Sequence, residues 1–312
     1  QVFREPFKLC ASHPETSPCS VMALVTGSFA VQQWRRYLGF CGKWQGSWHR
    51  FSAECDGSLA PGASFLGVCV SKPDEDLRSV QHCNYYEPGV VPVGGKLTGR
   101  EVDGLQEVDF GSFDAENFRN PFGPTSLAAY LDDCAVVAAA QVNPWPPKMF
   151  AMELISLSDT LRERRRVVAV WKPTGEDASS SSPVLQLASV TAISDREEQC
   201  SESHESCDAG GAEMAAWPVQ RVAMSVVDGN EICDETKVDW SSDGRWETLA
   251  GVADVAVRVP RQLTNDMLSS GKPAIGMSWR RANAEVVRVS VAYDKEGKMG
   301  ELVREFLSQP AD

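Results

Sequence analysis

The densest group of charged side chains that could bind a ligand is the run of arginines from Arg162 to Arg166. Alternate residues of a β-strand point to the same face, so Arg164 and Arg166 would lie side by side. Two interpretations follow. The arginines pair with acidic neighbours at the rim of a hairpin, or they form a cationic clamp for a ligand carboxylate. Four aromatic residues either line a cavity or form ordinary core packing, namely Trp44, Trp48, Phe51 and Tyr86.

The sequence contains no motif that is typical of a catalytic centre or a metal site. The four histidines are far apart in the sequence, and they are predicted to be surface or hydrogen-bonded residues. Cys200, His204 and Cys207 form a C-x3-H-x2-C pattern that lacks a fourth ligand and a rigid frame, so no metal site is predicted. The G-x-S-x-G elbow, the phosphate-binding loop and the dinucleotide-binding glycines do not occur. The sequence therefore favours a non-enzymatic protein with no catalytic residues.

The composition is that of an acidic globular protein. The 312 residues carry a formal charge of −13, which would repel a nucleic-acid backbone, so we expect no nucleic-acid partner. No stretch approaches the roughly 18–20 apolar residues that span a bilayer, so no transmembrane segment is predicted. The ten cysteines include no C-x-x-C pair, and we interpret most of them as reduced core residues. A chain of this length predicts two domains.

The periodicity of apolar residues predicts one short helix followed by many short strands. Apolar positions at helical spacing favour a helix over Val31–Phe40 that ends at the nearby glycines. Period-two runs separated by turn residues then predict an antiparallel sandwich or barrel. The predicted strands lie at 43–51, 64–70, 79–86, 105–110, 126–130, 135–142, 149–157, 166–171, 184–193, 221–227, 237–240, 252–259, 274–279 and 286–293.

Changes in composition divide the chain into four parts. Residues 1–29 form an extended N-terminal arm, residues 30–175 a first barrel, residues 176–216 an acidic, Ser-rich insertion or linker, and residues 217–312 a second barrel. A weak internal repeat favours duplication, because Trp171 aligns with Tyr293 at a separation of about one domain. Two unrelated hairpins could produce the same match.

A longer stretch gives the strongest resemblance to known proteins. Residues 34–52, which contain Trp-Gln-Gly-Ser at 44–47, resemble the opening of a cyanobacterial and plastid family of unknown function built from two lipocalin-like (calycin) barrels. Residues 150–155, 164–168 and 276–281 resemble it too, whereas residues 176–270 match poorly, so we expect the second barrel to be altered or incomplete. The resemblance implies an all-β fold of two tandem antiparallel barrels with a few short helices. In lipocalin-like barrels, a Trp such as Trp44 packs across the floor and an Arg lies against its ring.

The family is distantly similar to S-type phycobiliprotein lyases, and the resemblance sets the functional expectations. The first is a structural or assembly subunit of a larger photosynthetic complex, such as a photosystem or light-harvesting antenna. The alternatives are a carrier of a lipophile or of a tetrapyrrole or carotenoid pigment, and a lyase-like chromophore chaperone. In the carrier, the arginines would hold a propionate of the tetrapyrrole. The resemblance, together with a first residue, Gln1, other than Met, predicts residence in the plastid, in association with thylakoids through partners.

Overall fold

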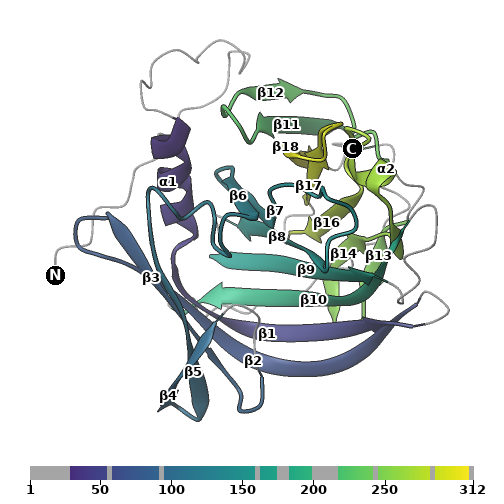
Figure 1. Ribbon diagram of the computed structural model, residues 1–312. Helices are drawn as coiled ribbons and strands as arrows, with labels where there is room; N and C mark the ends of the chain where they lie inside the picture. Colours follow the sequence, from purple (N-terminus) through teal and green to yellow (C-terminus); the bar gives the residue numbers. More distant parts are fainter. Residues whose placement is uncertain are drawn as a thin grey trace.

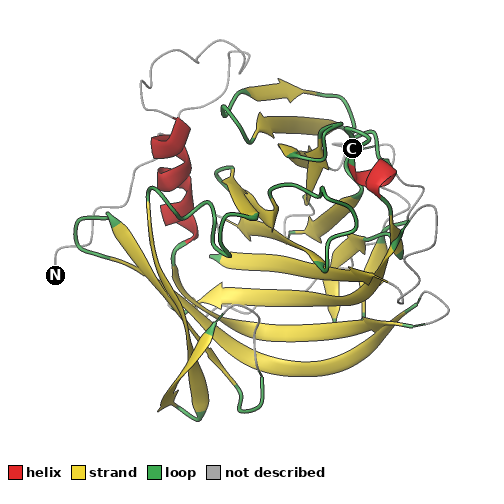
Figure 2. Ribbon diagram, viewed as in Figure 1, coloured by secondary structure: helices red, strands yellow, loops and turns green. Residues whose placement is uncertain are grey.

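Strands make up most of the protein, as Figure 2 shows for the computed structural model. In the part of the chain that the structure describes, eighteen strands form two antiparallel sheets, and there are two helices. The described residues are 29–54, 58–90, 95–158, 162–173, 183–198, 217–241, 245–281 and 285–308. The predicted N-terminal arm lies outside them, apart from Phe29.

The larger sheet has eleven strands among the described residues, and its long central strands are curved (Figure 1). Its order is β4-β5-β3-β2-β1-β10-β9-β8-β7-β6, with β15 paired to β10. The strands are β1 (Gly42–Ala53), β2 (Leu59–Pro73), β3 (Ser79–Tyr86), β4 (Lys96–Val102), β5 (Leu105–Asp114), β6 (Ser126–Tyr130), β7 (Cys134–Ala139), β8 (Phe150–Ser158), β9 (Glu163–Pro173), β10 (Leu185–Glu197) and β15 (Gln262–Leu263).

The second sheet has seven strands in the order β12-β11-β18-β17-β16-β14-β13. It packs on one face of the larger sheet, where apolar side chains of both sheets form one continuous core. The strands are β11 (Val219–Ser225), β12 (Glu231–Asp234), β13 (Glu247–Leu249), β14 (Val252–Arg258), β16 (Ile275–Arg280), β17 (Val286–Tyr293) and β18 (Met299–Leu307), and the short helix α2 (Asn265–Leu268) lies between β15 and β16.

Helix α1 (Phe29–Phe40) covers the outer edge of β6. The side-chain amide of Gln33, which is fully buried, donates to the carbonyl of Tyr130 at 2.8 Å and accepts from its N–H at 2.9 Å. Arg119 in the preceding loop accepts from the N–H of Ala128 at 2.7 Å. The backbone groups of an edge strand are therefore hydrogen-bonded to a helix and a loop, where a closed barrel would supply another strand.

The all-β, antiparallel class predicted from the sequence is confirmed, as is the helix near residues 31–40. The arrangement as two lipocalin-like barrels is not confirmed. Within the described residues, β4 and β6 end the order of one sheet and β12 and β13 that of the other, and neither sheet closes on itself. The strand predicted at 237–240 is wrong: this stretch is not part of a sheet, and the N–H of Val238 donates to the carboxylate of Glu305.

The segment predicted as an insertion or linker, residues 176–216, contains a central strand of the larger sheet. Strand β10 lies between β1 and β9 and pairs with both along most of its length. Strand β15, from beyond this segment, also joins the larger sheet. The two aromatic residues of the repeat, Trp171 and Tyr293, both pack against Phe150, at centroid distances of 5.7 and 6.1 Å. The boundaries of the predicted domains stay predictions.

We predict that Gln33→Ala lowers the free energy of unfolding by about 2 kcal/mol, because the buried N–H of Tyr130 loses its acceptor and the Tyr130 carbonyl keeps only a longer bond from Arg36. The measurement is urea denaturation followed by tryptophan fluorescence. Gln32→Ala, on the half-buried face of the same helix, is the matched control and should change stability by less than about 0.5 kcal/mol. Equal midpoints for the two variants would contradict this role of Gln33.

Candidate functional site

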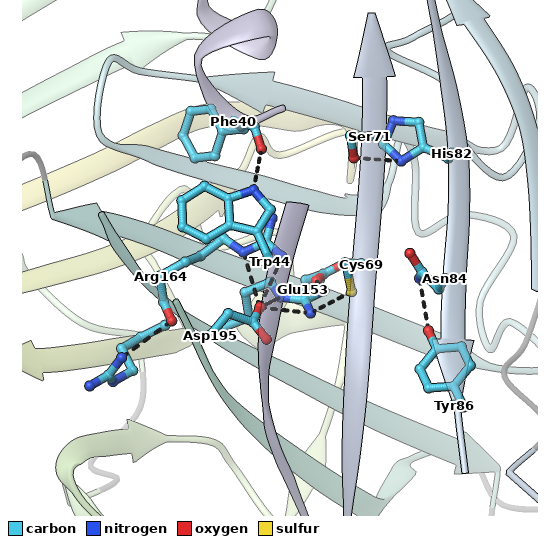
Figure 3. Close-up of polar contacts among 12 residues, drawn as sticks. Phe40, Trp44, Cys69, Ser71, His82, Asn84, Tyr86, Glu153, Arg164 and Asp195 are labelled. Carbon is cyan, nitrogen blue, oxygen red and sulfur yellow. Dashed lines mark hydrogen bonds and ion pairs between the residues drawn. The ribbon is translucent and has the colours of Figure 1, made fainter. Parts of the chain in front are cut away.

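The site lies on the face of the larger sheet next to α1, where β1 begins after the helix. Trp44, only 2% exposed, donates from its indole N–H to the carbonyl of Phe40 at 3.1 Å (Figure 3). The guanidinium of Arg164 on β9 lies over the Trp44 ring, 4.5 Å from its centroid. Gly42 makes the turn between helix and strand with a φ of 150°. The contact between this Trp and an Arg, expected from the resemblance, is present.

A second stack of the same kind lies four residues further along β1 and two residues further along β9. The guanidinium of Arg166 is 4.8 Å from the centroid of the Trp48 ring. Tyr86 meets Trp48 edge-on at 5.3 Å, and its hydroxyl accepts from the Asn84 side chain at 2.8 Å. Gly67 lies under Trp48, where a Cβ would come within 2.7 Å of the indole nitrogen. The missing side chain thus makes room for the ring.

One carboxylate oxygen binds both arginines. Oδ2 of Asp195, on the fully buried side of β10, accepts from Nε and Nη2 of Arg164 at 3.1 and 2.9 Å and from Nε of Arg166 at 2.9 Å. Arg166 also donates to Glu153 at 3.1 Å and to the Cys69 sulfur at 3.3 Å. Each guanidinium therefore has an aromatic ring against its face and hydrogen-bond acceptors at its edge.

Burial and neighbouring charges act on these groups in opposite directions. Burial lowers the pKa of Arg164, as does the charge of Arg166, while Asp195 raises it. Burial also acts to lower the pKa of Arg166, but Asp195 and Glu153 outweigh it, and this pKa lies above its usual value. Since the ordinary pKa of arginine is above 12, both side chains stay charged. The two positive charges are held by two carboxylates within the protein.

His82 lies next to this cluster and is covered by α1. Nδ1 of His82 is 3.0 Å from the Ser71 hydroxyl, and Nε2 is hydrogen-bonded to the hydroxyl of Tyr37. Burial, and then the charge of Arg164, lower the pKa of His82 to about 4. His49 is hydrogen-bonded as well, with Nδ1 3.0 Å from Oγ of Ser64. The prediction of hydrogen-bonded histidines is confirmed for these two residues.

Five of the six residues singled out in the sequence come together, and one does not. Trp44, Trp48, Tyr86, Arg164 and Arg166 surround the buried carboxylate, whereas Phe51 points to the opposite face and packs in the core between the sheets. Phe51 is three residues from Trp48, so the alternation of side chains along β1 directs it to the other face. The pairing of the arginines with acidic neighbours, one of the two interpretations, is confirmed. Their role in binding a ligand stays a prediction.

Sequence reasoning missed the residues that neutralise the arginines. The sequence places Asp195 in the predicted acidic insertion, because the residues that follow it are polar and charged. Its pairing with Arg164 across the β9–β10 ladder follows only from the register of the two strands. The alternation of apolar residues over 184–193, extended by two residues, would have placed Asp195 on the same face as Ile193.

Arg165, between the two site arginines, points to the other face and joins the sheets. It binds Asp254 of β14 at 2.7 Å, and its guanidinium lies 5.1 Å from the centroid of Trp279. Asp133 binds Arg281 and Arg304 of the second sheet at 3.3 and 2.6 Å. The interface between the sheets therefore has ion pairs at one end of its apolar core.

In the described part of the chain, no three histidine, cysteine or acidic side chains are grouped as they would be around a metal ion. None of the described helices is both long and apolar enough to pass through a membrane.

Comparison with known proteins shows the fold of this chain and nothing of its activity. A crystal structure of a protein of unknown function from the DUF3598 family of Nostoc punctiforme PCC 73102, a cyanobacterium, matches with a TM-score of 0.58 and 12% identity over 89% of this chain and 99% of that one. A putative outer membrane protein from Bacteroides fragilis NCTC 9343 aligns with a TM-score of only 0.19 and 8% identity, which carries no argument. No protein-family model matches the sequence, and neither does a curated protein.

We predict that Asp195→Asn lowers the free energy of unfolding by about 3–5 kcal/mol, because it leaves two buried guanidinium groups without their shared carboxylate. The measurement is chemical denaturation. Glu198→Gln, which removes an exposed ion pair with Lys43, is the control and should cost no more than about 0.5 kcal/mol. A loss at Asp195 as small as that of the control would contradict a structural role for this carboxylate.

We predict that His82 makes the protein less stable as the pH falls from 6.5 to about 4. In this range the unfolded chain binds a proton at this imidazole, whose ordinary pKa is 6.5, and the folded chain does not. The contribution amounts to up to about 3 kcal/mol. Denaturation of wild type and His82→Gln at a series of pH values measures it, with His49→Gln as control. The wild-type and His82→Gln curves should converge towards pH 4, and parallel curves would refute the assignment.

Proposed function

We propose that this chain is a non-catalytic protein that serves as a structural or assembly subunit of a larger, photosynthetic complex. The observation that carries the proposal is the neutralisation of the site from within. The groups best suited to hold an anionic ligand, Arg164 and Arg166, are bound to Asp195 and Glu153 and stacked on tryptophans. A cluster that already satisfies its own charges is suited to holding strands in place.

The aromatic cluster between α1 and the larger sheet supports the same proposal. Trp34, Tyr37 and Phe40 of α1 are buried against Phe118 and Tyr130, with ring centroids 5.2–6.0 Å apart. These side chains form one packed aromatic cluster with little room for a ligand between them. The photosynthetic setting and residence in the plastid rest on the resemblance of residues 34–52, and a cyanobacterial neighbour of the same fold accords with them.

A second candidate, the pigment or lipophile carrier, is favoured by one observation. Beyond Arg166, the side chains on the same face of the sheet are small or apolar and only half buried, among them Val137, Val168, Val170 and Thr191. Glu153 lies at the border of this strip, with one-fifth of its side chain exposed. Such a strip could accommodate an elongated apolar molecule, the lyase-like chaperone being a special case that must also admit a client cysteine.

We predict that the tagged chain, purified from a photosynthetic host, lacks an absorption band in the visible range and elutes with photosystem or antenna subunits in native gel filtration. Cross-linking mass spectrometry identifies the subunits in contact with it. A stoichiometric pigment band, abolished by Val168→Trp and Val170→Trp, would favour the carrier instead. Elution as a free monomer from a native extract would refute the assembly proposal.

A further inference from the structure

The four outer strands of the two sheets differ in how their free edges are protected. Strand β6 is covered by α1, as described above. Strand β4 has exposed charges at Lys96 and Arg100, a register shift between Leu97 and Glu101, and a positive φ at Gly99. Strand β13 has only three residues, and its pairing is also shifted. Charges, bulges and cover are the usual means by which proteins prevent another strand from adding to an edge.

Strand β12 has a regular register, and its two central residues, Ile232 and Cys233, are uncharged. It pairs residue for residue with β11, and in the described sheet no strand lies on its outer side (Figure 1). Ile232 is 58% exposed and Cys233 is exposed as well, although the two side chains point to opposite faces. Val227, in the turn between β11 and β12, is 77% exposed. Apolar groups therefore reach solvent on this edge and at its end.

The backbone of Cys233 faces outwards from the sheet. The Ser225 N–H donates to the Asn230 carbonyl, which makes this pair a hydrogen-bonded position of the ladder next to the turn, where the Ser225 carbonyl accepts from Gly229. In an antiparallel ladder, hydrogen-bonded pairs alternate with non-bonded pairs, which makes Ile232 with Ala223 the next bonded pair. The N–H and carbonyl groups of Glu231 and Cys233 are thus directed away from β11 and towards any strand that would add there.

Acidic residues surround this edge. Asp228 and Glu235 are exposed on either side of β12. Within the strand, Glu231 binds Arg36 and Asp234 binds Arg221, so the basic side chains nearby are already engaged. A strand that adds here would bring its ends close to carboxylates, which favours basic flanking residues and disfavours acidic ones.

We propose that β12 is the docking edge of this protein, to which an extended segment of a partner protein, apolar in its centre and basic at its ends, adds as an eighth strand. The partner's main chain would bond to the outward groups of Glu231 and Cys233, and its apolar side chains would cover Ile232. This inference rests on the proposed assembly function and names the surface through which it acts.

The test uses a fluorescein-labelled peptide whose centre alternates valine and threonine and whose two ends carry lysines, titrated into the full chain by fluorescence anisotropy. Cys233→Pro should weaken binding about tenfold or more, because proline removes the outward N–H while the ladder to β11 stays intact. Cys233→Thr, which keeps this N–H, should bind like wild type. Ile232→Lys should also weaken binding, and Ile232→Thr much less, since only the lysine repels the basic peptide.

The outcomes separate this inference from the proposed function. A peptide with glutamate in place of lysine should bind at least about tenfold more weakly than the basic peptide. Equal binding of the two peptides, or of Cys233→Pro and Cys233→Thr, would overturn the docking edge. If the native complex survives Cys233→Pro, the assembly function stands and the docking edge falls. If peptide binding follows the expected pattern but no native complex is found, the edge stands and the assembly function falls. Thermal melting of each variant shows that it is folded.

Discussion

Two positive charges side by side in a protein interior need a negative charge between them, and this requirement explains the order of strands in the larger sheet. Arg164 and Arg166 on β9 share one oxygen of Asp195. That oxygen lies on β10, which comes later in the chain and is inserted between β9 and β1. With β10 in this position, the two tryptophans of β1 can stack on the guanidinium groups of β9. The charge pair and the aromatic stacks thus specify one register for three strands.

The arginine run 164–166 also connects the two sheets, through its middle residue, Arg165. Because side chains alternate along a strand, Arg164 and Arg166 face the site while Arg165 faces the second sheet, where it binds Asp254. A slip of one residue in β9 would place two guanidinium groups in the core between the sheets and one in the site. Both ion-pair groups would then lose their partners at once, so the arginine run penalises every register except the observed one.

Local patterns predicted the elements better than their arrangement. Helical spacing near residues 31–40 and period-two runs elsewhere placed α1 and many of the strands, since local periodicity depends on residues close in sequence. Strand β4, with Thr98, Gly99 and Arg100 in its middle, and the four-residue β12 carry too little periodicity to be found. The pairing of Arg164 and Arg166 with an acidic neighbour was foreseen, but not which one, because Asp195 is separated from them by about 30 residues of chain. Closure into two barrels was expected from the resemblance, and the edge of β6 is bonded to a helix instead.

The position of α1 has a consequence for biosynthesis. The helix is near the beginning of the described chain, yet its side chains bind Tyr130, 97 residues later, and the sulfur of Met224, 191 residues later. A ribosome adding roughly 5–20 residues per second completes these partners many seconds after the helix has left the exit tunnel. Until β6 is made, Trp34, Tyr37 and Phe40 lack the rings of Phe118 and Tyr130 against which they pack. The nascent chain therefore presents an aromatic helix to its surroundings, which makes the newly synthesised protein a natural client of chaperones until this part of the larger sheet has formed.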